Sequence, residues 1–189
     1  MFFDSHAHLE PHRYGDPVED VIARAFAAGV SGIVHIGSGA DPVLFDEAVV
    51  LAAREPRIRA AIGCHPHEAD QATEATFAAI ERLSSRSEVV AVGEIGLDYH
   101  YDFSSRDGQR RVFERQLAIA AQADLPVVIH CREAHADCLE ILGSTRLATR
   151  PGVIHCFTGD LETAHRYVDL GFLVSIPGVV TFPGAGPLI

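Results

Sequence analysis

Short apolar runs alternate along the chain with longer stretches in which hydrophobic positions recur every three or four residues. Runs rich in Val, Ile or Phe and bordered by Gly or Pro are typical of strands, whereas the wider spacing predicts amphipathic helices. The predicted strands are Phe2–His8, Gly32–Gly37, Ile58–Gly63, Val89–Glu94, Pro126–His130, Gly152–His155 and Gly171–Ile176. The predicted helices are Pro17–Ala28, Pro42–Arg54, Glu74–Ser85, Asp107–Ala123, Glu133–Leu142 and Leu161–Leu170.

This strict alternation predicts an α/β fold in which parallel strands are joined by crossover helices. Two architectures satisfy it, a TIM-type (β/α) barrel and a doubly wound sheet. No GxGxxG motif follows the first strand, which argues against the dinucleotide-binding form of the doubly wound sheet. With no internal repeat and no low-complexity linker, residues 1–189 are expected to form a single domain.

Ionisable side chains stand at the carboxyl ends of four predicted strands. His6 and His8 lie two apart on the first strand and therefore face the same way, although an HxH pair alone is a weak signal. Glu94, His130 and His155 each follow an apolar run directly. In a parallel barrel these ends form one mouth, so the five residues predict a divalent-metal site. The alternative, solvent-facing polar residues at strand ends, does not explain why the pattern recurs.

The amino-acid composition limits how the chain could bind phosphate and metal ions. The chain of 189 residues has a net charge of −11, so affinity for phosphate would come from metal ions rather than from a basic surface. All 15 basic residues are Arg, and without Lys the chain cannot bridge two metals with a carbamylated lysine. Glu94 is the natural substitute, because one carboxylate can contact two ions. The mixed imidazole and carboxylate set suits Mg, Mn or Zn.

Targeting signals do not change this picture. No apolar run approaches the ~18 residues of a membrane span, and the start of the chain lacks the basic segment of a signal peptide. The four Cys show no CxxC spacing and are typical of reduced thiols. A cytoplasmic protein with no membrane association and no obligate protein partner is expected.

Four ordered motifs together resemble the TatD-type metal-dependent hydrolases. They are His6-Ala7-His8, Gly93-Glu94-Ile-Gly-Leu-Asp98-Tyr99, Pro126-Val-Val-Ile-His130-Cys-Arg132 and His155-Cys-Phe157-Thr158-Gly159. The resemblance covers the whole chain and implies a TIM-type barrel that hydrolyses phosphodiester bonds of DNA, as a 3′-to-5′ exonuclease, with a metal-bound hydroxide. It also implies two metal ions, one held by His6, His8 and Glu94 and one held by Glu94, His130 and His155, which makes Glu94 the central catalytic residue.

Substrate contacts are expected beside these ligands. His65 follows the third strand and either reaches a phosphate or is an ordinary loop histidine. Arg132 lies two residues after His130, on the same face, where it either binds a phosphate bidentately or pairs with a neighbouring acid. His67, Asp98 and Tyr99 are weaker candidates for the same mouth.

The sequence departs from the family pattern near its end. That pattern continues into an eighth strand with an Asp ligand, whereas the last acidic residue here is Asp169, on a predicted helix. We therefore expect about seven of eight strands, a C-terminally truncated barrel and impaired turnover. Two further functions stay open, a metal-dependent hydrolase of a small ester, amide or lactone, and a fragment that binds metal without catalysis.

Overall fold

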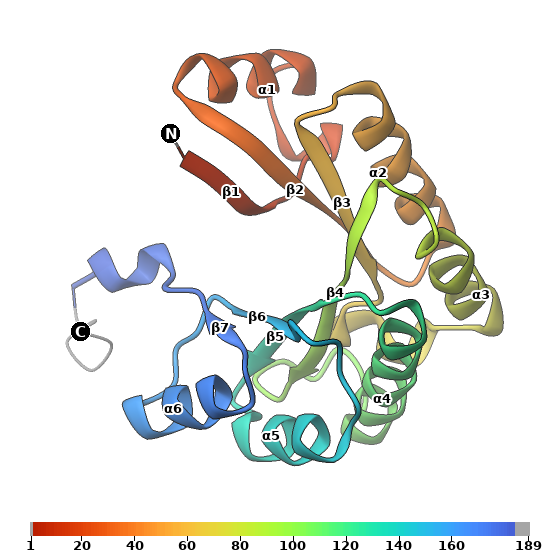
Figure 1. Cartoon of the computed structure of the whole chain (residues 1–189), viewed down its shortest axis with the longest axis vertical. Coiled ribbons are helices and arrows are strands. Elements are labelled where there is room, and N and C mark those ends of the chain that lie inside the picture. Colours follow the sequence, from red (N-terminus) through yellow and green to blue (C-terminus); the bar gives the residue numbers. More distant parts are fainter. Residues whose placement is uncertain (1, 184–189) are drawn as a thin grey trace.

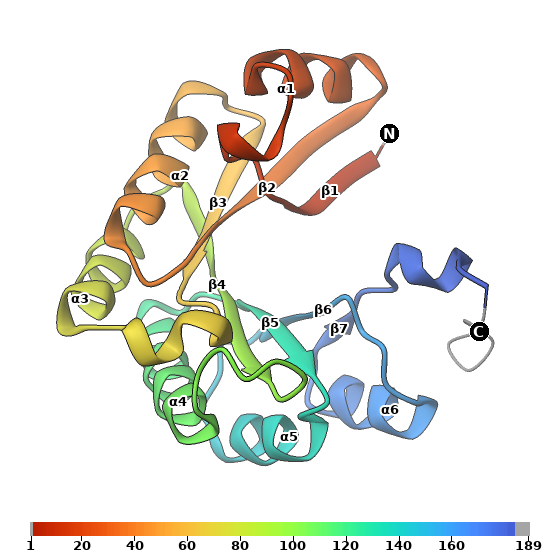
Figure 2. The same cartoon turned by 180° about the vertical axis from the view of Figure 1, so that it is seen from behind.

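Seven strands pair in parallel, in their order along the chain, in the computed structural model, which describes residues 2–183. The sheet curves, with its helices on the outside, so that β1 and β6 approach each other across its concave side (Figures 1 and 2). The strands are β1 (Phe2–Ala7), β2 (Val30–Ser38), β3 (Ile58–Gly63), β4 (Val89–Asp98), β5 (Val127–Arg132), β6 (Gly152–His155) and β7 (Leu173–Val174). The predicted parallel α/β architecture is confirmed.

Each strand up to β6 is followed by a helix. The helices are α1 (Val18–Ala27), α2 (Pro42–Arg54), α3 (Glu74–Leu83), α4 (Arg106–Ala123), α5 (His135–Ser144) and α6 (Leu161–Asp169), with short 3-10 turns η1 (Pro11–Arg13), η2 (Pro66–Gln71) and η3 (Gly178–Thr181). Local chemistry sets several ends. At α2, the carboxylate of Asp41 accepts the N–H of Val43 at 3.0 Å, and Pro42 occupies the first turn. Helix α2 has the predicted bounds at both ends.

The main core lies between the sheet and its helices. Phe45 on α2, Phe113 on α4 and Tyr167 on α6 are fully buried there, as are Ile62 and Leu142. Burying a side chain of this size stabilises the fold by about 1.5–3 kcal/mol. This packing fixes the strands and thereby the position of every side chain at their carboxyl ends.

Strand β4 is longer than predicted, because it continues past Glu94 to Asp98. The register shifts between Gly93 and Ile95, and Gly96 has a φ of 140°. A Cβ on Gly96 would lie 2.0 Å from the carbonyl oxygen of His130, so only glycine allows β4 and β5 to approach this closely. The continued strand places Asp98 opposite Arg132.

Helix α5 begins two residues later than predicted. Glu133 has a φ of 53°, a left-handed conformation that a helix cannot include, so the first helical residue is His135. Strand β7 is shorter than predicted, with only Leu173 and Val174 paired to β6. It forms one edge of the described sheet and β1 forms the other.

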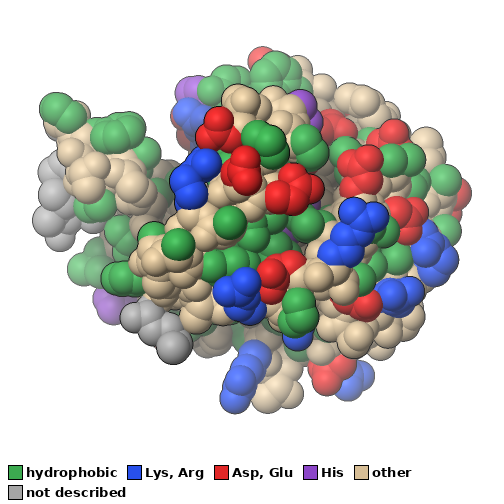
Figure 3. Space-filling model, turned by 90° about the horizontal axis from the view of Figure 1, so that it is seen from above, with side chains coloured by type: hydrophobic (Ala, Val, Ile, Leu, Met, Phe, Trp, Pro, Cys, Tyr) green, Lys and Arg blue, Asp and Glu red, His purple; other side chains and the backbone are tan. Residues whose placement is uncertain are grey.

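The surface carries charges of both signs. On the face seen in Figure 3, acidic and arginine side chains are interspersed among hydrophobic ones. Of the helices in residues 2–183, none has the length and apolar character needed to cross a bilayer.

Candidate metal centre

One buried carboxylate joins three strands. Glu94 on β4 is 4% exposed, and its Oε2 lies 3.3 Å from Nε2 of His6 on β1. Its other oxygen, Oε1, lies 3.1 Å from Nδ1 of His130 on β5. Glu94 therefore has one oxygen on each side of the mouth, as a carboxylate that serves two ions would need.

The first group of candidate ligands is His6, Glu94 and His155, which offer one ligand atom each within 4.8 Å of one another. The rings of His6 and His155 stack with centroids 3.5 Å apart. Nδ1 of His6 is buried and has no hydrogen-bond partner, which is unfavourable unless a ligand satisfies the site. Two imidazoles and a carboxylate are a donor set that divalent ions accept, so these residues fit a metal ion.

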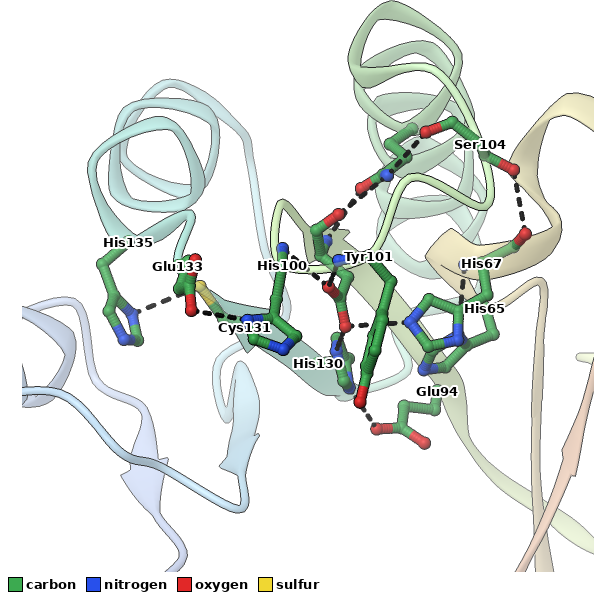
Figure 4. Close-up of polar contacts among 12 residues, drawn as sticks. His65, His67, Glu94, His100, Tyr101, Ser104, His130, Cys131, Glu133 and His135 are labelled. Atoms are coloured by element: carbon green, nitrogen blue, oxygen red, sulfur yellow. Dashed lines mark hydrogen bonds and ion pairs between the residues drawn. The ribbon is translucent and has the colours of Figure 1, made fainter.

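The second group is His65, His67 and His130, again with ligand atoms within 4.8 Å of one another. Oδ2 of Asp98 lies 2.9 Å from Nε2 of His67 and 2.8 Å from Nε2 of His130. Both imidazoles are labelled in Figure 4. A carboxylate that contacts a ligating histidine in this way fixes the orientation of the ring. Asp98 thus orients two of the three imidazoles.

The tautomer of His65 follows from its backbone contact. Nδ1 of His65 accepts the N–H of His67 at 3.2 Å, so this nitrogen is unprotonated. Burial lowers the pKa of His65 to about 3, and the neutral ring therefore carries its proton on Nε2. In this arrangement His65 is a hydrogen-bond donor rather than a metal ligand.

The pKa values of His155 and His130 are shifted in opposite directions. Burial lowers the pKa of His155 to about 4, which leaves a neutral ring with a free lone pair. Burial also lowers the pKa of His130, but the hydrogen bond and charge of Glu94 and the contact with Asp98 outweigh it, so that the net shift is upward. Both ring nitrogens of His130 face a carboxylate oxygen, of Glu94 at 3.1 Å and of Asp98 at 2.8 Å, so a metal ion bound to His130 would replace one of these contacts.

The two carboxylates stay ionised. Burial raises the pKa of Glu94, but hydrogen bonds from His130 and His6 leave it well below its usual value. For Asp98, burial again acts upward, and contacts with His67, the backbone of Tyr101 and His130 bring the pKa to about 2. The site therefore holds two negative charges at neutral pH, which favours cations.

Five of the seven predicted site residues, all except His6 and His155, line a cavity of about 290 Å³. Its lining is His8, Arg13, Ser38, His65, His67, Glu68, Glu94, Asp98, Tyr101, His130 and Arg132. The guanidinium of Arg132 lies over the Tyr101 ring at 4.9 Å. The ring of His8 lies 5.2 Å from that of His6, and its Nδ1 faces Glu10 at 3.4 Å.

The structure groups the five predicted ligands differently from the sets that the resemblance implied. His130 lies with His65 and His67, whereas His155 lies with His6 and Glu94. His8 belongs to neither of the two compact groups. The assignment of each ligand to an ion remains a prediction.

Sequence reasoning gave too little weight to His67 and Asp98. Two signals were available. His65 and His67 repeat the two-residue spacing of His6 and His8, and Asp98 follows Glu94 by two full pleats of the same strand. Tyr99, a weaker candidate, instead donates its hydroxyl to Asp137 at 2.6 Å, toward α5.

Comparison with known proteins places these observations in a family. The family model described as TatD related DNase matches residues 3–187. The uncharacterized metal-dependent hydrolase YabD of Bacillus subtilis is 42% identical over 190 residues, which cover 98% of this chain and 72% of that protein. A protein of Salmonella typhimurium named 3′-5′ ssDNA/RNA exonuclease TatD is 39% identical over 179 residues, covering 94% of this chain and 68% of that one.

Solved structures agree. The crystal structure of YJJV, a TatD homolog from Escherichia coli K12, has a TM-score of 0.87 and 32% identity, covering 97% of this chain and 71% of that one. A TatD family hydrolase from Entamoeba histolytica shares the fold with a TM-score of 0.76 at 23% identity, over 93% of this chain and 64% of that one. The predicted barrel-type fold, with seven parallel strands, is confirmed. The chain belongs to the TatD-related DNase family of metal-dependent hydrolases.

Proposed function

We propose that this protein hydrolyses phosphodiester bonds of DNA from the 3′ end, using two divalent ions bound at the carboxyl ends of the strands. The observation that carries the proposal is the position of Glu94, with one oxygen 3.3 Å from His6 and the other 3.1 Å from His130. The exonuclease name of the relative in Salmonella typhimurium supports the substrate class and the polarity. A cytoplasmic location remains a prediction.

The ligands that we propose are His6, His8, Glu94, His130 and His155. The unpartnered Nδ1 of His6, the neutral ring of His155 and the ionised Glu94 support this set. Bound divalent ions would act as Lewis acids on the phosphodiester and on water. Mg, Mn and Zn are the candidates, and both the number and the identity of the ions belong to the proposal.

Residues of the chain would bind and orient the substrate. Arg132 faces the cavity with a guanidinium whose planar geometry matches two phosphate oxygens. His65 would donate the Nε2 proton that its tautomer provides. Asp98 would hold His130 and His67 in place through Oδ2. Because the chain has a net charge of −11, substrate affinity would depend on this site rather than on a wide basic surface.

The test is hydrolysis of a 5′-labelled single-stranded oligonucleotide by the purified chain, with Mg, Mn or Zn added in separate reactions. We expect a ladder of products shortened from the 3′ end, which disappears with a chelator and with Glu94→Gln. If the oligonucleotide stays intact while a nitrophenyl ester is cleaved, the small-ester hydrolase is the correct alternative. If neither is cleaved, this chain does not catalyse the proposed reaction.

A further inference from the structure

The segment that joins β4 to α4 carries two exposed aromatic side chains beside the cavity. Tyr101 lines the cavity, and Phe103 packs against Tyr101 and His67. Tyr101 is 39% exposed and Phe103 is 64% exposed. Their rings are stacked, with centroids 5.1 Å apart and planes 13° from parallel. Isolated exposed aromatics are ordinary on protein surfaces, but a stacked pair that borders a polar cavity is a recognisable binding feature.

The segment that carries this pair is held on both sides. Oδ1 of Asp98 accepts the backbone N–H groups of His100 and Tyr101, both at 3.0 Å. On the other side, the hydroxyl of Ser104 donates to the carbonyl of His67 at 2.9 Å. Phe103 lies between these anchors, so its exposure is built into an ordered segment.

The aromatic pair continues directly from the histidine cluster. His67 packs edge-on against both rings, with centroids 5.5 Å from Tyr101 and 4.9 Å from Phe103. In the view of Figure 4, the Tyr101 ring lies between the side chains of His130 and His67. The guanidinium of Arg132 also lies over Tyr101. A nucleic acid strand with one phosphate bound at Arg132 would therefore place a neighbouring base against these aromatic rings.

We propose that Phe103, backed by Tyr101, is a stacking platform for an unpaired nucleobase next to the phosphodiester in the cavity. This inference rests on the proposed function, because it requires a nucleic acid in that cavity. Every base has an apolar face that stacks on an aromatic ring, so the platform accepts any sequence. A base inside a duplex already has both faces covered, and the platform therefore selects single strands.

Binding of two matched probes tests the platform. Both are single-stranded phosphorothioate oligonucleotides, which resist hydrolysis, and one has abasic residues at its 3′ end. With Mn present, the unaltered chain should bind the probe with bases at least about fivefold more tightly, the lower end for one stacked base. Phe103→Ala should remove this preference, and Phe103→Trp should keep it.

A matched control is Phe2→Ala, which removes another exposed phenylalanine, 72% exposed, at the opposite end of β1 from His6. It should leave the preference unchanged. If Phe103→Ala and the unaltered chain have equal melting temperatures, the substitution acts on binding rather than on stability. Equal affinity of the unaltered chain for both probes, or an intact preference in Phe103→Ala, would overturn the platform.

Hydrolysis of an ordinary oligonucleotide, measured in parallel, separates this inference from the proposed function. Hydrolysis without any preference for bases overturns the platform and leaves the nuclease proposal standing. A preference that depends on Phe103, without hydrolysis, supports the platform and overturns the nuclease proposal.

Discussion

His6 and His155 stack with their ring centroids 3.5 Å apart and their planes 8° from parallel, although they come from β1 and β6. These strands are separated by four others in the sheet, so the curvature of the sheet is what brings the rings together. Two close imidazoles beside Glu94 would repel each other if both were protonated. Their contact is stable when at least one is neutral, which agrees with the lowered pKa of His155.

Removing this pair should remove bound metal. We expect His6→Ala combined with His155→Ala to bind about one divalent ion fewer than the unaltered chain and to lose about two orders of magnitude or more in kcat/KM. Metal content after dialysis, measured by mass spectrometry, checks the first expectation. His12→Ala, an exposed histidine on η1, is the control and should keep its metal. Unchanged metal content in the double variant would contradict the proposed ligand set.

Asp98 should act through the histidines that it orients. Asp98→Asn keeps the size of the side chain but removes the charge that faces Nε2 of both His67 and His130. We expect kcat/KM to fall about 10- to 100-fold, as when a group that orients a metal ligand is lost. Steady-state kinetics on the oligonucleotide checks it. Asp102→Asn makes the same charge change at an exposed position of the same segment and should stay near the unaltered rate.

His35 should make stability depend on pH. It is 4% exposed, and burial lowers its pKa below the usual 6.5, although a backbone contact with Ala7 acts in the opposite direction. The folded state therefore binds fewer protons than the unfolded state. Its stabilising effect is complete above pH 6.5 and is lost as the pH falls from 6.5 through the pKa of the folded state.

Urea unfolding at pH 7 and pH 5 measures this effect. His35→Gln should reduce the loss of unfolding free energy over that interval, because glutamine does not titrate there. The exposed His165 on α6 provides the control, since His165→Gln should follow the unaltered chain. If all three proteins lose the same unfolding free energy between pH 7 and pH 5, His35 does not cause the pH dependence.

Glycine at position 96 should be essential for stability. A Cβ there would lie 2.0 Å from the carbonyl oxygen of His130, and the φ of 140° is strained for any other residue. We expect Gly96→Ala to destabilise the fold by about 3 kcal/mol or more. Gly143→Ala, on the exposed face of α5 with nothing within 4 Å of the added carbon, should be neutral or stabilising by about 1 kcal/mol. Thermal or urea unfolding compares the two, and equal stabilities would refute the packing argument.

Periodicity was sufficient for most of the fold because strands and helices here have clear apolar patterns. The strands at Ile58–Gly63 and Gly152–His155 have the predicted bounds. The hydrophobic pattern does not predict the end of β4, because the apolar run stops at Glu94 whereas the strand continues to Asp98. That continuation depends on Gly96 against the carbonyl of His130, a contact between distant residues that no local pattern contains.

The candidate site, too, could be predicted from the sequence only in part. Position at strand ends was enough to select His6, Glu94, His130 and His155, because parallel strands bring their carboxyl ends to one edge. It could not say which of them would group together, since this depends on the curvature of the sheet. The tautomer of His65 also depends on a backbone N–H whose direction only the three-dimensional structure gives.

Asp98 gives one oxygen to the backbone of the aromatic segment and the other to the imidazoles. The proposed stacking platform and the proposed metal site therefore both depend on this one side chain. Replacing or lengthening residues 99–105 to change substrate preference would disturb the rings of His67 and His130 unless Asp98 and its two backbone donors were retained. Laboratory variants with altered specificity should therefore keep Asp98 while they change Tyr101 and Phe103.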